Sequence, residues 1–330
     1  MGVVGSSAPP VGTPGIFYTY KDNNFHGGVD RLEFFHFVAN FTTPVSSSFA
    51  LVQSLPITAY TYTVCGLFVL NCIHQGGTSQ RVDPVSEWPM WQMQYRRFAA
   101  SERLVLNFTV DVGSDRAGIR WYELEKTGAS SYAILQEGSY APADGRHRWM
   151  SSIGIDRNGG IALGFSASSS SENPSLRYAT RLPGDPVGTL QTEVVLQAGV
   201  GSQTSSNRWG DCSALAIDPV DHGTFWFTGE YYAANSGNGW TNRIGSFQMP
   251  ECLPQTATVA IGDVSVTEID GATADFTVTR SNATTALPPA RPPSAMRKAR
   301  PPSATVRSCS SRPPATVAPK AARRSPRPSP

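Results

Sequence analysis

The stretch HRWMSSIGIDRNGGIALGFS, residues 147–166, decides the fold, because it recurs in weaker form as NRWGDCSALAIDPVDHGTFWFT, residues 207–228. Each copy runs from Arg-Trp into a short apolar segment that ends in Asp, then through a turn into a second apolar segment. ILQEG (134–138) precedes the first copy and VLQAG (195–199) precedes the second. Repetition at a fixed period is the sequence signature of a repeat architecture.

The period is about 60 residues, since Trp149 and Trp209 are 60 positions apart. A more diverged copy comes first, in which GIRWYEL (118–124) matches the later SLRYATRL (175–182). Alternating apolar residues make each unit a small antiparallel meander. A lone meander cannot bury both faces, whereas stacked neighbours cover one another. The sequence therefore predicts an all-β fold, with a β-propeller-like array of about 60-residue antiparallel blades over residues 16–253.

Composition places the remaining boundaries. Residues 1–15 are rich in Gly, Pro and Ser, and we expect a disordered N-terminus. Residues 254–286 contain a linker and two alternating segments. Residues 287–330 hold 12 of the 26 prolines and ten Lys/Arg without an acid, and we expect a disordered Pro/Arg-rich tail. This abrupt change is typical of a shifted reading frame in GC-rich DNA, and a natural basic tail is the alternative.

Charge and hydropathy limit the partners. Outside the tail the chain carries 17 Lys/Arg against 25 Asp/Glu, so its body is acidic and does not suit nucleic-acid binding. The longest apolar stretch, around residues 64–73, is too short to span a bilayer as a helix. The N-terminus has neither the basic region nor the apolar region of a signal peptide.

Five cysteines are present, and none forms a C-x-x-C pair or lies beside a histidine cluster, which argues against zinc. Cys65 and Cys72 are close together in an apolar run, and a local disulfide across a hairpin or loop is the favoured interpretation. Two buried thiols are the alternative.

Residues 259–282 resemble the first two strands of a Calx-β domain, a calcium-binding β-sandwich. The resemblance rests on IGDVSVTE, followed by ATADFTVTRSN, and covers a quarter to a third of that fold. It implies calcium as a cofactor, with Glu268 matching a ligand at the end of the first strand and with Asp263 and Asp270 nearby. Calcium takes six to eight oxygen ligands, so this segment would retain a vestigial site.

Residues 16–253 resemble uncharacterised bacterial extracellular proteins with propeller-like repeats that often precede Calx-β modules. The resemblance rests on CIHQGGTSQRVDP (72–84), on the repeated segments quoted above and on RIGSFQMPEC (243–252). It implies an extracellular or cell-surface location. It implies no enzymatic activity.

We therefore expect a non-catalytic extracellular binding or adhesion module that takes a glycan or a cell-surface ligand. No G-x-S-x-G, H-E-x-x-H or P-loop lysine motif occurs. Aromatic side chains late in the repeat region are the candidate ligand contacts: Trp226, Tyr231, Tyr232 and Trp240. The repeated Arg-Trp pairs are more economically explained as parts of each blade, because a single ligand site does not need residues repeated in every blade.

The main alternative is a carbohydrate-active propeller hydrolase of sialidase or glycosidase type. Such enzymes take carboxylates from separate blades, which leaves no local motif. The candidate catalytic carboxylates for this alternative are Asp111, Glu123, Asp156 and Asp218. Asp156 and Asp218 are first of all turn-forming residues. A scaffold attached to a separate catalytic domain is a third reading.

Overall fold

Strands dominate the computed structural model, which describes residues 2–5, 7–250, 258–261 and 278–281. In that part of the chain the helical elements are α1 (Asn23–His26) and a 3-10 turn (Pro44–Ser46). The expectation of an all-β protein is confirmed. Contacts divide the chain into two compact units, residues 1–256 and 257–330.

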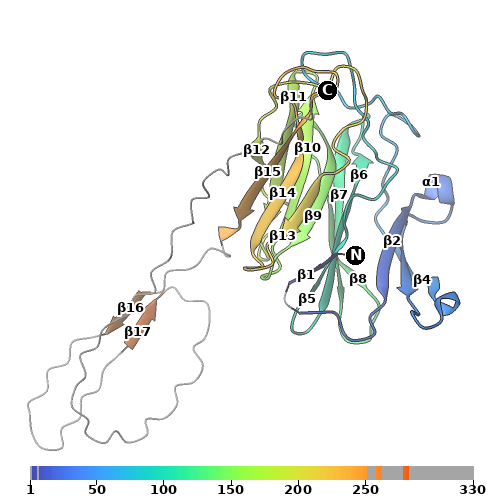
Figure 1. The fold of residues 1–330 in the computed structure, drawn as a ribbon, viewed down its shortest axis with the longest axis vertical. Helices are drawn as coiled ribbons and strands as arrows, with labels where there is room; N and C mark the ends of the chain where they lie inside the picture. Colours follow the sequence, from blue (N-terminus) through green and yellow to red (C-terminus); the bar gives the residue numbers. More distant parts are fainter. Residues whose placement is uncertain (1, 6, 251–257, 262–277, 282–330) are drawn as a thin grey trace, which may run out of the picture. The chain divides into compact units, whose positions relative to one another are not determined.

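Four sheets make up the described part of the first unit (Figure 1). The first sheet consists of β2 (Gly15–Lys21), β3 (Arg31–Val38) and β4 (Ser48–Pro56). The second consists of β1 (Gly2–Val4), β5 (Gln94–Arg97), β6 (Glu102–Asp111), β7 (Ala117–Lys126) and β8 (Ala133–Tyr140). The third consists of β9 (His147–Ile155), β10 (Ile161–Ser169), β11 (Glu172–Arg181) and β12 (Val194–Gln197). The fourth consists of β13 (Ala214–Ile217), β14 (Thr224–Tyr231) and β15 (Thr241–Gln248).

The sequence repeat corresponds to consecutive sheets. The apolar parts of SIGID and SALAID lie in β9 and β13, the first strands of the third and fourth sheets, and the Asp of each segment follows its strand directly. GIRWYEL, SLRYATRL and TNRIGSFQM lie in β7, β11 and β15, each of which follows two antiparallel strands of its own sheet. ILQEG and VLQAG close the second and third sheets as β8 and β12. Each repeat is therefore an antiparallel meander, as the alternation predicts.

The turn between the first two strands of a repeat depends on its Asp. In the third sheet the Asp156 Oδ1 accepts hydrogen bonds from the backbone N–H groups of Asn158 and Gly160, both at 2.8 Å. In the fourth sheet the Asp218 Oδ1 accepts one from the N–H of Val220 at 2.8 Å. A short carboxylate side chain that bonds its own backbone two residues on stabilises a tight turn.

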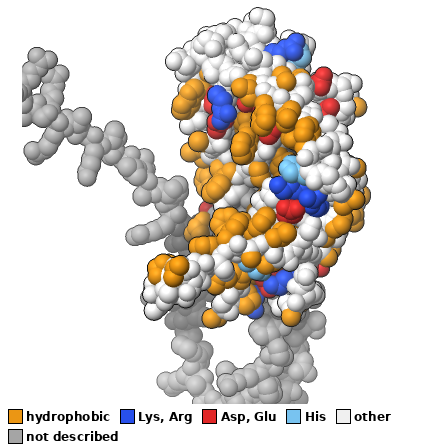
Figure 2. All heavy atoms as spheres, turned by 90° about the vertical axis from the view of Figure 1, so that its right-hand side faces the viewer, with side chains coloured by type: hydrophobic (Ala, Val, Ile, Leu, Met, Phe, Trp, Pro, Cys, Tyr) orange, Lys and Arg blue, Asp and Glu red, His pale blue; other side chains and the backbone are white. Residues whose placement is uncertain are grey.

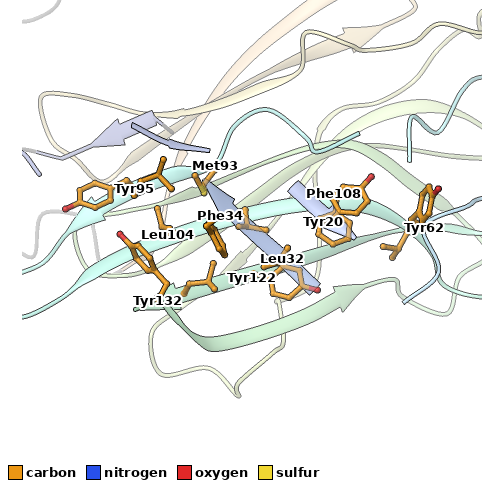
Figure 3. Packing of buried hydrophobic residues seen from close by; sticks show 14 residues of the cluster. Tyr20, Leu32, Phe34, Tyr62, Met93, Tyr95, Leu104, Phe108, Tyr122 and Tyr132 are labelled. Atoms are coloured by element: carbon orange, nitrogen blue, oxygen red, sulfur yellow. The ribbon is translucent and has the colours of Figure 1, made fainter. Parts of the chain in front are cut away.

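The first and second sheets pack through an aromatic cluster (Figure 3). Tyr20 of β2 stacks on Phe108 of β6 with ring centroids 4.2 Å apart, and Phe108 in turn stacks on Tyr122 of β7. Leu32 and Phe34 of β3 are buried in the same cluster. Aromatic pairs at such distances add to the stabilisation from burial alone.

The third sheet is buried on both faces. Leu163 and Phe165 of β10 pack with Val105 and Trp121 of the second sheet. On the other side, Leu176 of β11 packs with residues of the fourth sheet, including Phe225 and Phe227 of β14. A strand that is covered on both sides reads as a near-continuous apolar or small-residue run, and β10 has that character.

The first sheet has an outer face with no neighbour in the described part of the chain. Strand register places Phe17, Phe35 and Leu51 side by side on it, next to Phe37 and Phe49. Figure 2 looks onto this side of the molecule and shows hydrophobic side chains spread over it. The outer face of the fourth sheet carries the exposed Trp226 and Ile244.

Residues 57–93 contain no strand and connect the first sheet to the second. Cys65 and Cys72 in this segment form a disulfide with Cα atoms 5.9 Å apart. Isolated bridges join Ile73 to Val82 and Thr61 to Asp111 of β6. Ile73 and Val82 are buried against Trp149 and Trp209, so the segment packs onto the Arg-Trp positions of two successive repeats.

The ends of the chain differ in part from the predicted boundaries. Gly2–Val4 forms β1, which pairs in parallel with β5, so an ordered strand occurs inside the segment expected to be disordered. In the second unit, β16 (Thr258–Ile261) pairs antiparallel with β17 (Val278–Ser281). Residues 262–277 and 282–330 lie outside the described residues, and the Calx-β and tail assignments stay predictions. No helix in the described part of the chain is long and apolar enough to cross a membrane.

Candidate functional site

A pocket of about 490 Å³ lies at one end of the fourth sheet. Strand alternation places Thr228 and Glu230 of β14 on one face, and Glu230 pairs across the strands with Asn242 of β15. Residues 203–213 form one wall, and the β14–β15 connection with Asn238 and Trp240 forms the other.

Glu230 is the most perturbed carboxyl group of this pocket. Its Oε2 accepts a hydrogen bond from the backbone N–H of Gly210 at 3.0 Å, and its Oε1 is buried with no hydrogen-bond partner among the described residues. Burial raises the pKa of Glu230, and the negative charge of Asp211 raises it further, against the opposing hydrogen bond from Gly210. A carboxyl group in such surroundings favours its protonated form.

Asp211 is held in a different environment in the same pocket. Its Oδ2 accepts a hydrogen bond from Arg208 Nε at 3.1 Å and contacts Arg208 Nη2 as well. Arg208 also lies 3.8 Å from Asp83 Oδ2 through its Nη1. Asp83 is almost fully buried, and burial raises its pKa while Arg208 lowers it. Arg208 thus neutralises Asp211 beside the partly buried Glu230.

Two further side chains give the pocket polar and aromatic surface. Ser213 is 6% exposed, and its Oγ is buried without a hydrogen-bond partner in the described part of the chain. Trp240 is 55% exposed and lines the opposite wall. Cys212, a free and exposed thiol, also lines the pocket.

Of the four aromatic residues expected to contact a ligand, Trp240 alone lines this pocket. Trp226 is 42% exposed on β14 and donates its indole N–H to Asp218 Oδ2 at 3.0 Å. Tyr231 ends β14 and is partly buried. Tyr232 is corrected: it is completely buried, stacks on Trp209 and donates its hydroxyl to Gln203, so it has no surface for a ligand.

The carboxylates proposed for a glycosidase are dispersed and engaged elsewhere. Asp111 ends β6 and accepts a hydrogen bond from the N–H of Gly113. Glu123 is 1% exposed and paired with Arg103 and Gln136. Asp156 and Asp218 hold the turns described above. None of these four lines the pocket at the end of the fourth sheet.

The calcium candidates Glu268, Asp263 and Asp270 fall outside the described residues. Within residues 2–5, 7–250, 258–261 and 278–281, no group of three or more His, Cys, Asp or Glu side chains could hold a metal ion.

Sequence reasoning missed Glu230 and Asp211, because neither belongs to a recognised motif. A signal was present in the comparison of the two repeat copies. The first reads HRWM (147–150), and the second reads NRWGD (207–211), with Gly-Asp inserted after the shared Trp. Glu230 follows the apolar segment of β14 in TFWFTGE (224–230), where the other copy continues with Ser and Ala.

Comparison with family models and with curated proteins finds no match. Among solved structures, the GH43 endo-arabinanase from Bacillus licheniformis is 11% identical, with 75% of this chain and 71% of that chain covered and a TM-score of 0.33. The xylan β-1,4-xylosidase from Bacillus halodurans C-125 is 9% identical, covers 73% and 39%, and has a TM-score of 0.35. The endo-arabinase from Bacteroides thetaiotaomicron VPI-5482 is 8% identical, covers 71% and 89%, and has a TM-score of 0.22.

These findings correct the expectation of a non-catalytic adhesion module. All three solved structures are named as enzymes, an endo-arabinanase, a xylosidase and an endo-arabinase. The prediction that the chain is not an enzyme is therefore withdrawn.

Proposed function

We propose that this chain is a carbohydrate-active hydrolase whose meanders form β-propeller-like blades, and that its reaction takes place in the pocket at the end of the fourth sheet. One observation carries the proposal. A partly buried carboxyl group with a raised pKa, Glu230, shares this pocket with an ion-paired carboxylate, Asp211. Glycoside hydrolysis uses two carboxyl groups, one that donates a proton and one that acts as base or nucleophile.

The surroundings assign the two roles. Glu230 keeps its proton to a higher pH than an ordinary glutamate, so it acts as the general acid and donates that proton to the leaving glycosidic oxygen. Asp211, which forms an ion pair with Arg208, is the carboxylate that activates water or attacks the sugar. If Asp211 activates water, it accepts that water's proton, and exchange with solvent returns a proton to Glu230. If Asp211 attacks the sugar, the ionised Glu230 takes a proton from the water that then cleaves the bond between the sugar and Asp211.

The rest of the pocket suits a sugar ring. Trp240 offers an exposed aromatic surface for its apolar face. Asn238 and Asn242 offer amide groups that can pair with its hydroxyls. A few polar groups placed on an apolar wall are typical of small-molecule sites. An extracellular location, expected from the resemblance, agrees with a polysaccharide substrate.

Hydrolysis assays on a panel of polysaccharides, with arabinan and xylan among them, test the proposal through release of reducing sugar. Glu230→Gln should lower kcat on the substrate found by ~10²–10⁴-fold, the usual contribution of a positioned general acid. Asp211→Asn should produce a loss of similar size, because the attacking carboxylate is removed.

The matched control is Glu125→Gln. Glu125 lies on β7 of the second sheet, where it pairs with Arg103, and it does not line the pocket. This variant should retain the wild-type rate. Full activity in the Glu230 or Asp211 variants, or no activity on any glycan of the panel, would overturn the proposal.

A further inference from the structure

A second pocket, of about 630 Å³, opens where the second and third sheets end side by side. The β6–β7 turn, the start of β9 and the end of β10 form three of its walls. Residues 57–93 contribute the remaining wall through His74 and Arg81. Neither Glu230 nor Asp211 lines this pocket.

The lining of the second pocket is basic, although the body of the chain is acidic. Arg81 and Arg116 both line it, and within the described part of the chain neither forms an ion pair. Arg116 donates through Nη1 to the carbonyl of Pro142 at 3.0 Å. The one acidic residue of the lining is Asp115, whose Oδ1 accepts the backbone N–H of Cys65. Two guanidinium groups face one carboxylate, so the pocket has a net positive charge.

A pair of neutral imidazoles lies beside the guanidinium groups. His147 Nδ1 accepts the backbone N–H of Ala117 at 3.3 Å, so in the neutral ring the proton is on Nε2. That Nε2 lies 3.3 Å from His74 Nδ1, which then accepts. Burial, His74, Arg116 and Arg81 lower the pKa of His147 to about 4, and burial and Arg81 lower that of His74. The pair thus offers the Nε2–H of His74 as a free donor.

We propose that this second pocket binds an acidic saccharide through its anionic substituent, a carboxylate or a sulfate ester. Arg81 and Arg116 pair with the anion, since guanidinium forks match the oxygens of both groups. The volume is far larger than a bare anion needs. The hydroxyls of Ser114, Ser169 and Ser170 supply partners for the sugar hydroxyls. The site goes beyond the hydrolysis proposed above and does not depend on it.

Calorimetric titration with D-glucuronate, D-glucose 6-sulfate and D-glucose tests the site and separates the two anionic sources. At least one of the acidic sugars should bind more than tenfold tighter than glucose. The variant carrying Arg81→Gln and Arg116→Gln should lose at least tenfold in that affinity. The tighter of the two acidic ligands identifies the anionic group.

A control variant removes one guanidinium charge elsewhere. Arg97 lies on β5, opposite Glu102 in the strand register, at the end of β6 that is far from the pocket. Arg97→Gln should bind like the wild type. Near-ultraviolet circular dichroism shows whether the double variant keeps its packed fold, and Arg81→Lys with Arg116→Lys serves as a second variant that retains the charge and should keep part of the affinity.

Histidine ring signals in proton NMR locate the ligand, because the chain has five histidines. Binding should shift the signals of His74 and His147 and leave those of the other three unchanged, in the wild type and in Glu230→Gln alike. Equal affinity for glucose, no binding of either acidic sugar, binding that survives the double glutamine variant, or shifts confined to other histidines would overturn the proposal. Loss of hydrolysis in Glu230→Gln with binding retained keeps the two proposals distinct.

Discussion

Arg148 and Arg208 occupy the same position of the repeat and have opposite surroundings. The Arg148 side chain is completely buried and pairs with Asp144 and Glu193, which fixes the edge of the third sheet. The Arg208 side chain is 59% exposed and pairs with Asp211 at the pocket. Pairs that are desolvated need every donor satisfied, whereas an exposed guanidinium is free to face a ligand. The same repeat position therefore holds a buried ion pair in one copy and an exposed ion pair beside a pocket in the next.

The stability of the chain at different pH values tests the state of Glu230. The unfolded chain releases this proton at the ordinary glutamate pKa of about 4.3, whereas the folded chain holds it to a higher pH. Between the two values the folded state binds more protons, so its stability falls as pH rises. Glu230→Gln removes that loss. The melting temperature of the variant relative to that of the wild type should therefore rise between pH 4 and pH 8.

The charge of Asp211 helps to raise the pKa of Glu230. Asp211→Asn should therefore lower the upper limit of the pH range over which the stability of the folded chain falls. Thermal melts of the wild type, Glu230→Gln and Asp211→Asn at several pH values measure these differences in stability. A difference between Glu230→Gln and the wild type that is the same at every pH would show that the pKa of Glu230 is not raised.

At the scale of elements, small residues decide how closely two sheets approach. Gly164 lies in the middle of β10, where a Cβ atom would lie 2.5 Å from the ring of Phe227 of β14. Phe227 is completely buried between the third and fourth sheets. Protein interiors are close-packed, so a methyl group added at this position must displace a neighbouring side chain or strand. Gly164 thus sets the distance between two successive repeats.

Gly164→Ala should lower the free energy of unfolding by about 1–3 kcal/mol, the usual effect of overpacking a core. Urea denaturation followed by tryptophan fluorescence measures it. Gly184→Ala is the matched control, because nothing lies within 4 Å of a Cβ atom there, and it should change stability little. Equal stability of Gly164→Ala and the wild type would mean that the two sheets separate easily.

At the scale of the whole molecule, the four sheets of the first unit stabilise one another through successive clusters. The aromatic cluster joins the first sheet to the second, and two further clusters join the second to the third and the third to the fourth. Both candidate pockets are lined by residues of this unit. A lone meander of this size would be marginal, so the unit folds as a set.

A chain that ends at Thr256 should therefore fold without residues 257–330. Its midpoint of urea denaturation should equal that of the full chain, and its far-ultraviolet circular dichroism should show a folded β protein. It should retain any hydrolytic activity and the binding of the acidic sugar. Aggregation of the shortened chain, or loss of either function with the fold intact, would show that residues after 256 complete the unit.

The repeat read from the sequence located the strands of three sheets, because alternation and turn residues are local properties. Segments between residues 16 and 94, IFYTY, RLEFFHF, FALVQ and TAYTYTV, also favoured strands, although they did not align with the repeat. The first three lie in β2, β3 and β4, whereas TAYTYTV (58–64) forms no strand. It could not show that β1 pairs with β5, because that pairing joins residues about 90 positions apart. It also gave no sign that residues 57–93 would lack strands and pack onto Trp149 and Trp209.

The sequence by itself determined the strand pattern, the turns at Asp156 and Asp218, and the segregation of charge into the last residues. The tertiary structure alone decided which polar residues line the two pockets. Glu230 and Asp211 meet because β14 and the loop before β13 are brought together, and Arg81 and Arg116 meet because residues 57–93 fold back on the β6–β7 turn. Strand formation depends on neighbours in sequence, whereas a shift in pKa and a ligand pocket depend on burial and on charges brought close by the fold.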